Sequence, residues 1–154
     1  MKKGTAMMNS PTDALTHGVY LVGTNVNGVQ NLMTAAWVTQ ISSKALLVAV
    51  GRSHYTAELI RQSGHFSLSV LSQEQREIAR SCGTVSGRKA NKLEGLCVTP
   101  SADGDPLLAG AVAHFACRVI HTAEVLDHVL FCAEIADAQL LEGTPLSYHA
   151  KEFF

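Results

Sequence analysis

The first third of the chain has the apolar spacing of β-strands. Residues 18–23 form a β-branched and aromatic run, and the Asn27-Gly28 pair that follows favours a tight turn with positive φ. A second strand is predicted from residue 30 to residue 42. Residues 45–50 are apolar without alternation, which is typical of a strand covered on both faces. We therefore expect the fold to open with consecutive strands.

Two short helices are predicted in the middle of the chain. Residues 53–64 begin with hydroxyl side chains that can cap helical N–H groups, and they end on Gly64, which suits the left-handed conformation that closes many helices. Residues 65–71 return to a strand pattern. Residues 72–75 have the S-x-x-Q spacing of a capping box, so a second helix is expected there, with Gly83 as its end.

The second half of the chain contains the longest β-type runs. Residues 84–106 are rich in Gly, Ser, Lys and Asp and predict an irregular excursion with one helical turn at 88–93. Residues 115–125 and 128–140 are two long strands joined closely enough to form a hairpin, and a short last strand is expected at 146–148. Six or seven strands with two short helices indicate a mainly β fold, an antiparallel barrel with helical insertions.

Composition narrows the class of protein. The chain has 154 residues, is 47% hydrophobic and 16% charged, and has a net charge of −1, which fits one folded domain and disfavours disorder or nucleic-acid binding. The apolar stretches are shorter than a membrane span, and polar residues after Lys2 and Lys3 interrupt any signal peptide, so we expect a soluble cytoplasmic protein. We expect the cysteines to be buried, reduced thiols, and the histidine spacing predicts no metal site. The cysteines are Cys82, Cys97, Cys117 and Cys132.

A first candidate site lies in the predicted strand at residues 31–42. Alternation would place Met33, Ala35, Trp37 and Thr39 on one face and Thr34 on the other. These residues fit an ordinary sheet strand in which threonine is chosen for its β propensity. They also fit a platform whose small side chains let a flat ring approach the backbone. The spacing alone leaves both interpretations open.

Two further clusters are suited to an anion. Arg52, Ser53 and Thr56 stand at a predicted helix start, where free N–H groups and the helix dipole favour negative charge. Residues 86–92 gather several cations beside a glycine in a loop. The alternatives are hydroxyls that merely cap the helix and a solvated basic loop. In a chain with so few charges, the two clusters together suggest one anionic cofactor.

His128 is the candidate acid–base residue. It begins a long predicted strand and directly follows Asp127, whose carboxylate can hold the imidazole. A purely structural histidine at the hairpin end fits the pattern equally well. The sequence has no G-x-S-x-G elbow, P-loop or G-x-G-x-x-G fingerprint, so hydrolase, NTPase and Rossmann interpretations lack support.

Taken in order along the chain, five segments resemble the flavin reductase-like family. The similarity runs from about residue 18 to residue 154. Because the five segments follow one another in the same order as in the family, a chance similarity is unlikely. The resemblance implies one FMN-binding split β-barrel domain over residues 1–154, Greek-key-like and antiparallel, with residues 1–16 loosely ordered. It also implies a homodimer with FMN near the interface. The segments are residues 31–42, 53–56, 64–71, 86–92 and 127–131.

The resemblance also implies site residues. Met33, Thr34 and Ala35 would line the isoalloxazine ring, and Trp37 and Thr39 would support the ring or the ribityl chain. The ribityl–phosphate end would meet a second set, in which the loop cations help to neutralise the phosphate, and His128 would approach the ring or an incoming nicotinamide. That second set is Ser53, Tyr55, Thr56, Ser86, Arg88 and Lys92.

The function implied is an oxidoreductase that passes hydride or electrons from NADH or NADPH through FMN to free flavin or a redox partner protein. Two alternatives stay open. One is a flavoredoxin-like electron carrier that another protein reduces, and the other is an interaction protein that kept the barrel without the cofactor. The choice between NADH and NADPH is open too, because the chain carries no Rossmann discriminator residue.

Overall fold

The computed structural model describes residue 8, residues 10–88, residues 90–149 and residue 153. It confirms a mainly antiparallel β fold with two short helices. The strands are β1 (Tyr20–Val26), β2 (Val29–Ala35), β3 (Val38–Ser42), β4 (Ala45–Gly51), β5 (His65–Val70), β6 (Val98–Pro100), β7 (Pro106–Leu108), β8 (Ala113–Val125) and β9 (His128–Leu140). The helices are α1 (Tyr55–Ser63) and α2 (Arg76–Thr84), with 3-10 turns at Pro11–Ala14 and Gln73–Gln75.

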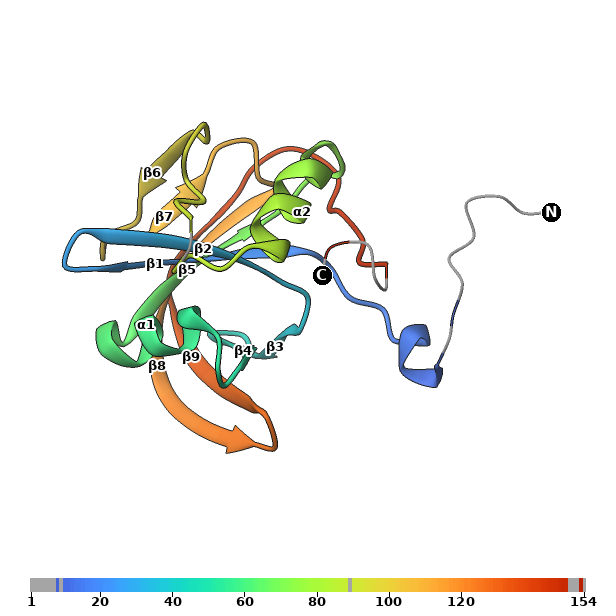
Figure 1. Cartoon of the computed structure of the whole chain (residues 1–154), viewed down its shortest axis with the longest axis horizontal. Helices are drawn as coiled ribbons and strands as arrows, with labels where there is room; N and C mark the ends of the chain where they lie inside the picture. The colour runs from blue at the N-terminus through green and yellow to red at the C-terminus, as the bar shows by residue number, and fades with distance from the viewer. Residues whose placement is uncertain (1–7, 9, 89, 150–152, 154) are drawn as a thin grey trace.

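Seven strands form one antiparallel sheet in the order β2-β1-β5-β8-β9-β4-β3, and β6 and β7 form a small separate pair (Figure 1). The edge strands β2 and β3 are consecutive in the chain, with only Ala36 and Trp37 between them. Three Cα–Cα steps reach at most about 11 Å, so the two edges of the sheet must come close together here. The sheet therefore curls into a barrel that is split, and not hydrogen-bonded shut, between β2 and β3.

The prediction of a single strand over residues 30–42 was wrong. Pairing with β1 ends at the Tyr20–Ala35 register, and pairing with β4 begins at Val38. The N–H of Ala49 donates to the carbonyl of Trp37 at 3.0 Å, which holds the link between the two strands against β4. The halves of the predicted strand therefore belong to opposite edges of the sheet, and their side chains do not share one continuous face.

Several local predictions are confirmed. Asn27 and Gly28 adopt positive φ of 52° and 86° in the turn between β1 and β2. Gly64 ends α1 in the left-handed conformation at φ 79°. The capping box is present at Ser72, whose N–H donates to the Gln75 side chain at 3.0 Å. The long strands β8 and β9 form the predicted hairpin, which extends away from the rest of the sheet (Figure 1).

Other local predictions need correction. The excursion after α2 contains β6 and leads into β7, and the described residues 88 and 90–93 form turns and irregular backbone in place of the predicted helical turn. Residues 146–148 make only an isolated bridge to Gly18. Helix α2 ends at Thr84, one residue past Gly83, and position 83 needs glycine for a different reason: an added side chain would collide with the backbone of Phe153. Of the four cysteines predicted to be buried, Cys97 is exposed and Cys132 is only partly buried. In the N-terminal segment Pro11–Ala14 form a turn, whereas residues 1–7 and 9 lie outside the described residues.

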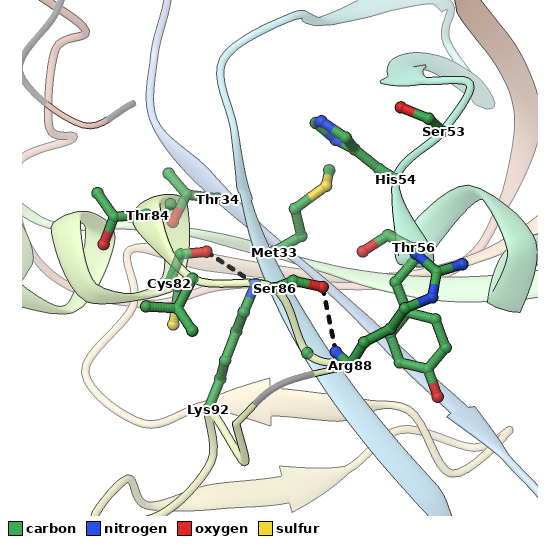
Figure 2. Close-up of a pocket in the computed structure, with 14 residues that line it drawn as sticks. Met33, Thr34, Ser53, His54, Thr56, Cys82, Thr84, Ser86, Arg88 and Lys92 are labelled. Atoms are coloured by element: carbon green, nitrogen blue, oxygen red, sulfur yellow. Dashed lines mark hydrogen bonds between the residues drawn. The ribbon is translucent and has the colours of Figure 1, made fainter.

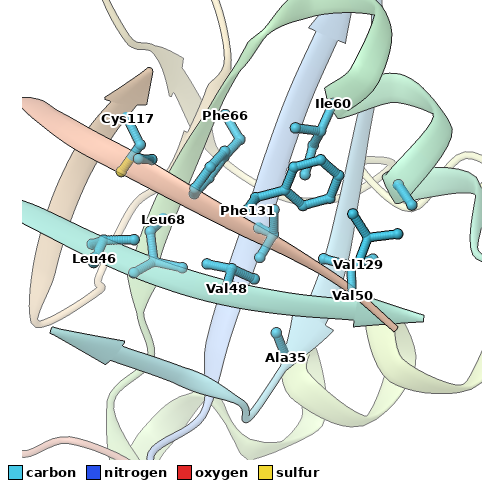
Figure 3. Close-up of a cluster of buried hydrophobic side chains, with 13 residues drawn as sticks. Ala35, Leu46, Val48, Val50, Ile60, Phe66, Leu68, Cys117, Val129 and Phe131 are labelled. Atoms are coloured by element: carbon cyan, nitrogen blue, oxygen red, sulfur yellow. The ribbon is translucent and has the colours of Figure 1, made fainter. Parts of the chain in front are cut away.

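Two apolar clusters stabilise the fold and place the helices. The first fills the inside of the barrel and includes Ile60 of α1, with Phe66 and Phe131 among its largest fully buried side chains (Figure 3). The second contains Leu21 and Leu32 of the first hairpin together with Ala79, Cys82, Leu108, Leu146 and Phe153. Helix α1 thus packs into the barrel core and α2 packs outside it, so the start of α1 and the end of α2 flank β2.

Gly23 in β1 supplies a test of this packing. An added Cβ would lie 2.6 Å from the carbonyl oxygen of Pro106 and even closer to Ser67 Oγ. We expect Gly23→Ala to lower the free energy of unfolding by about 1–3 kcal/mol, the usual cost of overpacking. Thr39→Ala, at an exposed β3 position, should change it by less than about 0.5 kcal/mol. Urea unfolding measures both, and equal midpoints for the wild type and Gly23→Ala would contradict the packing described.

Candidate functional site

A polar cavity of about 230 Å³ lies between the start of α1, the end of α2 and the loop that follows α2 (Figure 2). Its lining includes hydroxyl, amine and guanidinium groups, and Met33 of β2 separates its two sides in this view. The residues that line it are Met33, Thr34, Ser53, His54, Tyr55, Thr56, Cys82, Gly83, Thr84, Val85, Ser86, Gly87, Arg88 and Lys92.

An apolar cavity of about 250 Å³ adjoins the polar one at the split between β2 and β3. Met33, Thr34 and His54 line both cavities, so the two are neighbours, and we refer to them together as the joined cavities or the hollow. Small residues dominate the apolar part. Its remaining lining residues are Ala35, Ala36, Trp37, Ala49, Val50, Gly51, His128 and Tyr148.

Helix α1 begins at the polar cavity with its first N–H groups uncapped by side chains. His54 is the residue before the helix, and its side chain makes no capping hydrogen bond. The prediction that hydroxyls cap this helix was therefore wrong. Thr56 accepts a 3.1 Å hydrogen bond from the buried Asn31 amide, which leaves its own hydroxyl proton available. Free N–H groups at the positive end of a helix dipole are suited to an anion.

The loop after α2 closes the polar cavity at Gly87. A side chain here would collide with the Asn31 amide, so only glycine lets the loop approach β2 this closely. Ser86 Oγ accepts a 3.1 Å hydrogen bond from the Arg88 N–H. The Arg88 guanidinium lies 4.8 Å from the centre of the Tyr55 ring and also forms an ion pair with Glu58. Glu58 therefore offsets much of the charge that Arg88 brings to the cavity.

Lys92 also brings a positive charge to the cavity, and no carboxylate of the described residues pairs with it as Glu58 pairs with Arg88. Its Nζ donates a 3.0 Å hydrogen bond to the carbonyl oxygen of Cys82, and in the described part of the chain it has no carboxylate partner. The side chain is half-buried. Burial lowers the pKa of Lys92, and the Cys82 thiol opposes this in part. An anion in the cavity would stabilise this ammonium group. Lys89, predicted in the same basic cluster, lies outside the described residues.

Aromatic groups border the apolar cavity. The Trp37 ring is 51% exposed and packs against the His128 ring at 5.0 Å between centres and 42° between planes. His128 Nδ1 lies 2.9 Å from Asp127 Oδ1, as the adjacent pair in the sequence predicts. The hydrogen bond to His128 lowers the pKa of Asp127 and orients the imidazole. The small residues Ala35 and Ala36 leave space beside these rings for a flat group.

Sequence reasoning missed His54 and Tyr148. The His54 ring packs against Gly51, where a Cβ would lie 3.1 Å from Nε2, and it stands at the junction of the two cavities. Burial lowers the pKa of His54, and the nearby His128 and Lys92 lower it further. His54 stands between Ser53 and Tyr55, so its position gave a usable signal. Tyr148 comes from the C-terminal segment through a 2.9 Å backbone hydrogen bond to His17, which no local pattern indicates.

The structure brings together all but one of the predicted site residues. Thr39 is the exception, because it lies exposed on β3 and borders a third hollow on the other side of Trp37. Thr34 lines the cavities, but its hydroxyl already donates to the Ala79 carbonyl at 2.7 Å. Arg52, suggested for an anion, does not line them and pairs with Glu124 at 3.6 Å. The eleven others are Met33, Thr34, Ala35, Trp37, Ser53, Tyr55, Thr56, Ser86, Arg88, Lys92 and His128.

The described residues hold neither a cluster of metal ligands nor a helix that could cross a membrane. In residues 10–88 and 90–149, with the isolated residues 8 and 153, no three side chains of His, Cys, Asp or Glu gather as metal ligands would. Over the same residues, no helix has the length and apolar character needed to cross a membrane.

Comparisons with known proteins agree with this geometry. A family model for the flavin reductase like domain matches residues 12–154. A reductase component of 4-nitrophenol 4-monooxygenase/4-nitrocatechol 2-monooxygenase from Rhodococcus opacus is 32% identical over 138 residues, which are 88% of this chain and 72% of that protein. An uncharacterised protein of Archaeoglobus fulgidus is 40% identical over 117 residues, which are 71% of this chain and 66% of that protein.

A solved structure is similar along almost the whole chain. The crystal structure of flavoredoxin from Methanosarcina acetivorans superposes with a TM-score of 0.79 at 29% identity, over 98% of this chain and 84% of that one. The chain spans about two thirds to three quarters of the two curated relatives. Sequence and fold therefore point to the same family.

Proposed function

Because this chain belongs to the flavin reductase-like family, we propose that it is an oxidoreductase that holds FMN in the two adjoining cavities. It takes hydride from NADH or NADPH and passes electrons to free flavin or to a redox partner protein. One observation carries the proposal. A half-buried lysine with no carboxylate partner among the described residues shares a polar cavity with an uncapped helix start, and that cavity adjoins an apolar one beside small residues.

The polar cavity fits the phosphate and ribityl end of FMN. Lys92 and the first N–H groups of α1 offer positive charge, while Ser53 and Ser86 offer hydroxyls. Charged hydrogen bonds of this kind are among the strongest available to a protein. A phosphate would also relieve a cost present in the structure, because burial disfavours the charged form of Lys92. The donor set therefore suits a phosphate ester.

The apolar cavity fits the isoalloxazine ring. Ala35 and Ala36 are small and buried, so a flat group can lie against the backbone there. Met33 stands at the junction of the two cavities, between the ring and the ribityl chain in this arrangement. Trp37 and His128 would flank the ring on the side that reaches solvent. The order along the hollow thus matches the order of the parts of FMN.

Bound FMN supplies the hydride and electron transfer, and the chain supplies binding, orientation and access. The half-buried His128 is held by Asp127 at the edge of this cavity, where an incoming nicotinamide would meet the ring. His128 would position that nicotinamide against the ring.

The similarity to flavoredoxin supports a second candidate function, a carrier that another protein reduces. Both candidates need FMN in the same cavities, so binding does not separate them. Steady-state oxidation of NADH and NADPH with added FMN separates the two candidate functions. A reductase turns over many nucleotides per chain, whereas a carrier shows little turnover without its partner.

The cellular setting is part of the proposal. The relative from Rhodococcus is a reductase component of a monooxygenase, which supports a partner protein as the electron acceptor here.

The four cysteines are free, including the exposed Cys97. Free thiols are usual where glutathione and thioredoxin keep the compartment reducing, and this supports the cytoplasm as the location.

Lys92 and Arg88 form a matched pair for testing the phosphate site. Lys92→Ala should weaken FMN binding by about 10- to 100-fold, because a charged hydrogen bond contributes roughly 1.5–3 kcal/mol. Arg88→Ala should weaken it less, because Glu58 already pairs with that guanidinium. Titration of FMN fluorescence measures both affinities. A larger loss in Arg88→Ala than in Lys92→Ala would place the anion elsewhere.

His128→Ala tests the role of the imidazole in nucleotide access. FMN should stay bound, because the phosphate contacts come from α1 and the loop after α2. Reduction by NADH or NADPH should slow by about tenfold or more, the effect of losing roughly 1.4 kcal/mol in the transition state. Anaerobic stopped-flow absorbance measures the rate, with His121→Ala on the exposed face of β8 as the control. Wild-type rates with both nucleotides would remove His128 from the mechanism.

The exposed apolar side chains support a homodimer. Six of them lie in or just before β3, in the second half of β8, on the turn between β8 and β9 and at the last residue of β9, and their burial against a second copy would remove apolar surface from water. We expect light scattering at micromolar concentration to give about twice the 16.4 kDa chain mass. The mass of a single chain would contradict this. The side chains are Trp37, Ile41, Ile120, Val125, Leu126 and Leu140.

A further inference from the structure

Basic groups surround the joined cavities without acidic ones. His54, His128, Lys92 and Arg88 line the hollow, and no Asp or Glu of the described chain does. The two nearest carboxylates are already engaged, since Glu58 pairs with Arg88 and the exposed Asp127 contacts His128. A further positive charge inside this hollow therefore meets repulsion that no lining carboxylate relieves.

This repulsion acts most directly on His54. It stands at the junction of the cavities and lines the polar one together with Lys92 of the loop after α2 and the apolar one together with His128 of β9. Figure 2 shows its ring directed into the hollow from the wall opposite Lys92. Within the described residues, its ring nitrogens have no hydrogen-bond partner. The side chain is therefore free to gain a proton without breaking an existing contact.

The charge balance changes when a phosphate enters. In the free protein, burial, His128 and Lys92 all lower the pKa of His54, so its neutral form predominates at neutral pH. A phosphate dianion beside Lys92 and the start of α1 reverses the sign of the local field. The thiol of Cys82 does not offset this change, because burial raises its pKa and keeps it neutral.

The geometry points to His54 as a proton-coupled binding residue, which takes up a proton when a phosphate-bearing flavin enters the joined cavities. This inference rests on the proposed function and adds a pH dependence to it. By linkage, a group that gains a proton on binding makes the affinity higher at low pH and lower as the pH rises. One such group changes the affinity by at most about tenfold per pH unit.

Calorimetric titration with FMN tests the inference. Measured at pH 6.5 in buffers that differ in ionisation enthalpy, the heats give the number of protons bound per FMN. Three proteins are compared: the wild type, His54→Gln and His121→Gln. His121 is exposed on β8 and lines neither cavity, so it controls for the loss of a histidine. Subtracting the His54→Gln value removes protons exchanged by the FMN phosphate itself.

We expect the wild type and His121→Gln to take up more protons than His54→Gln, by up to about one per FMN. Between pH 6 and 8, the affinity of the wild type should also fall more steeply than that of His54→Gln. Equal proton numbers in the wild type and His54→Gln would overturn the inference while leaving FMN binding intact. Failure of all three proteins to bind FMN would overturn the proposed function as well.

Discussion

The two-residue link between β2 and β3 is the constraint on which the site depends. These strands pair at opposite edges of a seven-stranded sheet, and a link of about 11 Å at most forces the edges together. The sheet must curl, and β2 and β3 approach each other without pairing, because β2 pairs with β1 and β3 pairs with β4. The apolar cavity lies at this opening, with Ala36 and Trp37 in its wall. The fold thus creates the hollow before any ligand is considered.

The electrostatics of the site follow from how the two helices cover that barrel. Helix α1 packs into the core and points its uncapped start at β2, while the end of α2 approaches β2 from outside. The loop after α2 then brings Lys92 to the Cys82 carbonyl, half-buried and without a described carboxylate partner. A charge held in this way is costly in the absence of an anion. That cost is the physical reason to assign the cavity to a phosphate and not to a neutral ligand.

The sequence predicts the parts of this arrangement that depend on neighbours in the chain. The Asn27-Gly28 turn, the end of α1 at Gly64 and the β8–β9 hairpin were all readable from local residue types. The break after β2 could not be read from the sequence, because apolar and small residues continue through it. Only the choice of pairing partners divides the strand. Thr39, which the family resemblance placed in the site, follows this break and borders a third hollow. His54 was missed because its role comes from two distant elements, β9 and the loop after α2.

The central claim is that the joined cavities hold one FMN per chain. The most direct measurement is the visible absorption spectrum of the purified protein after incubation with excess FMN and removal of the free flavin, followed by identification of the flavin released on denaturation. The account predicts a yellow protein with a flavin spectrum that releases FMN in a one-to-one ratio with the chain. A protein that stays colourless after this treatment would contradict it.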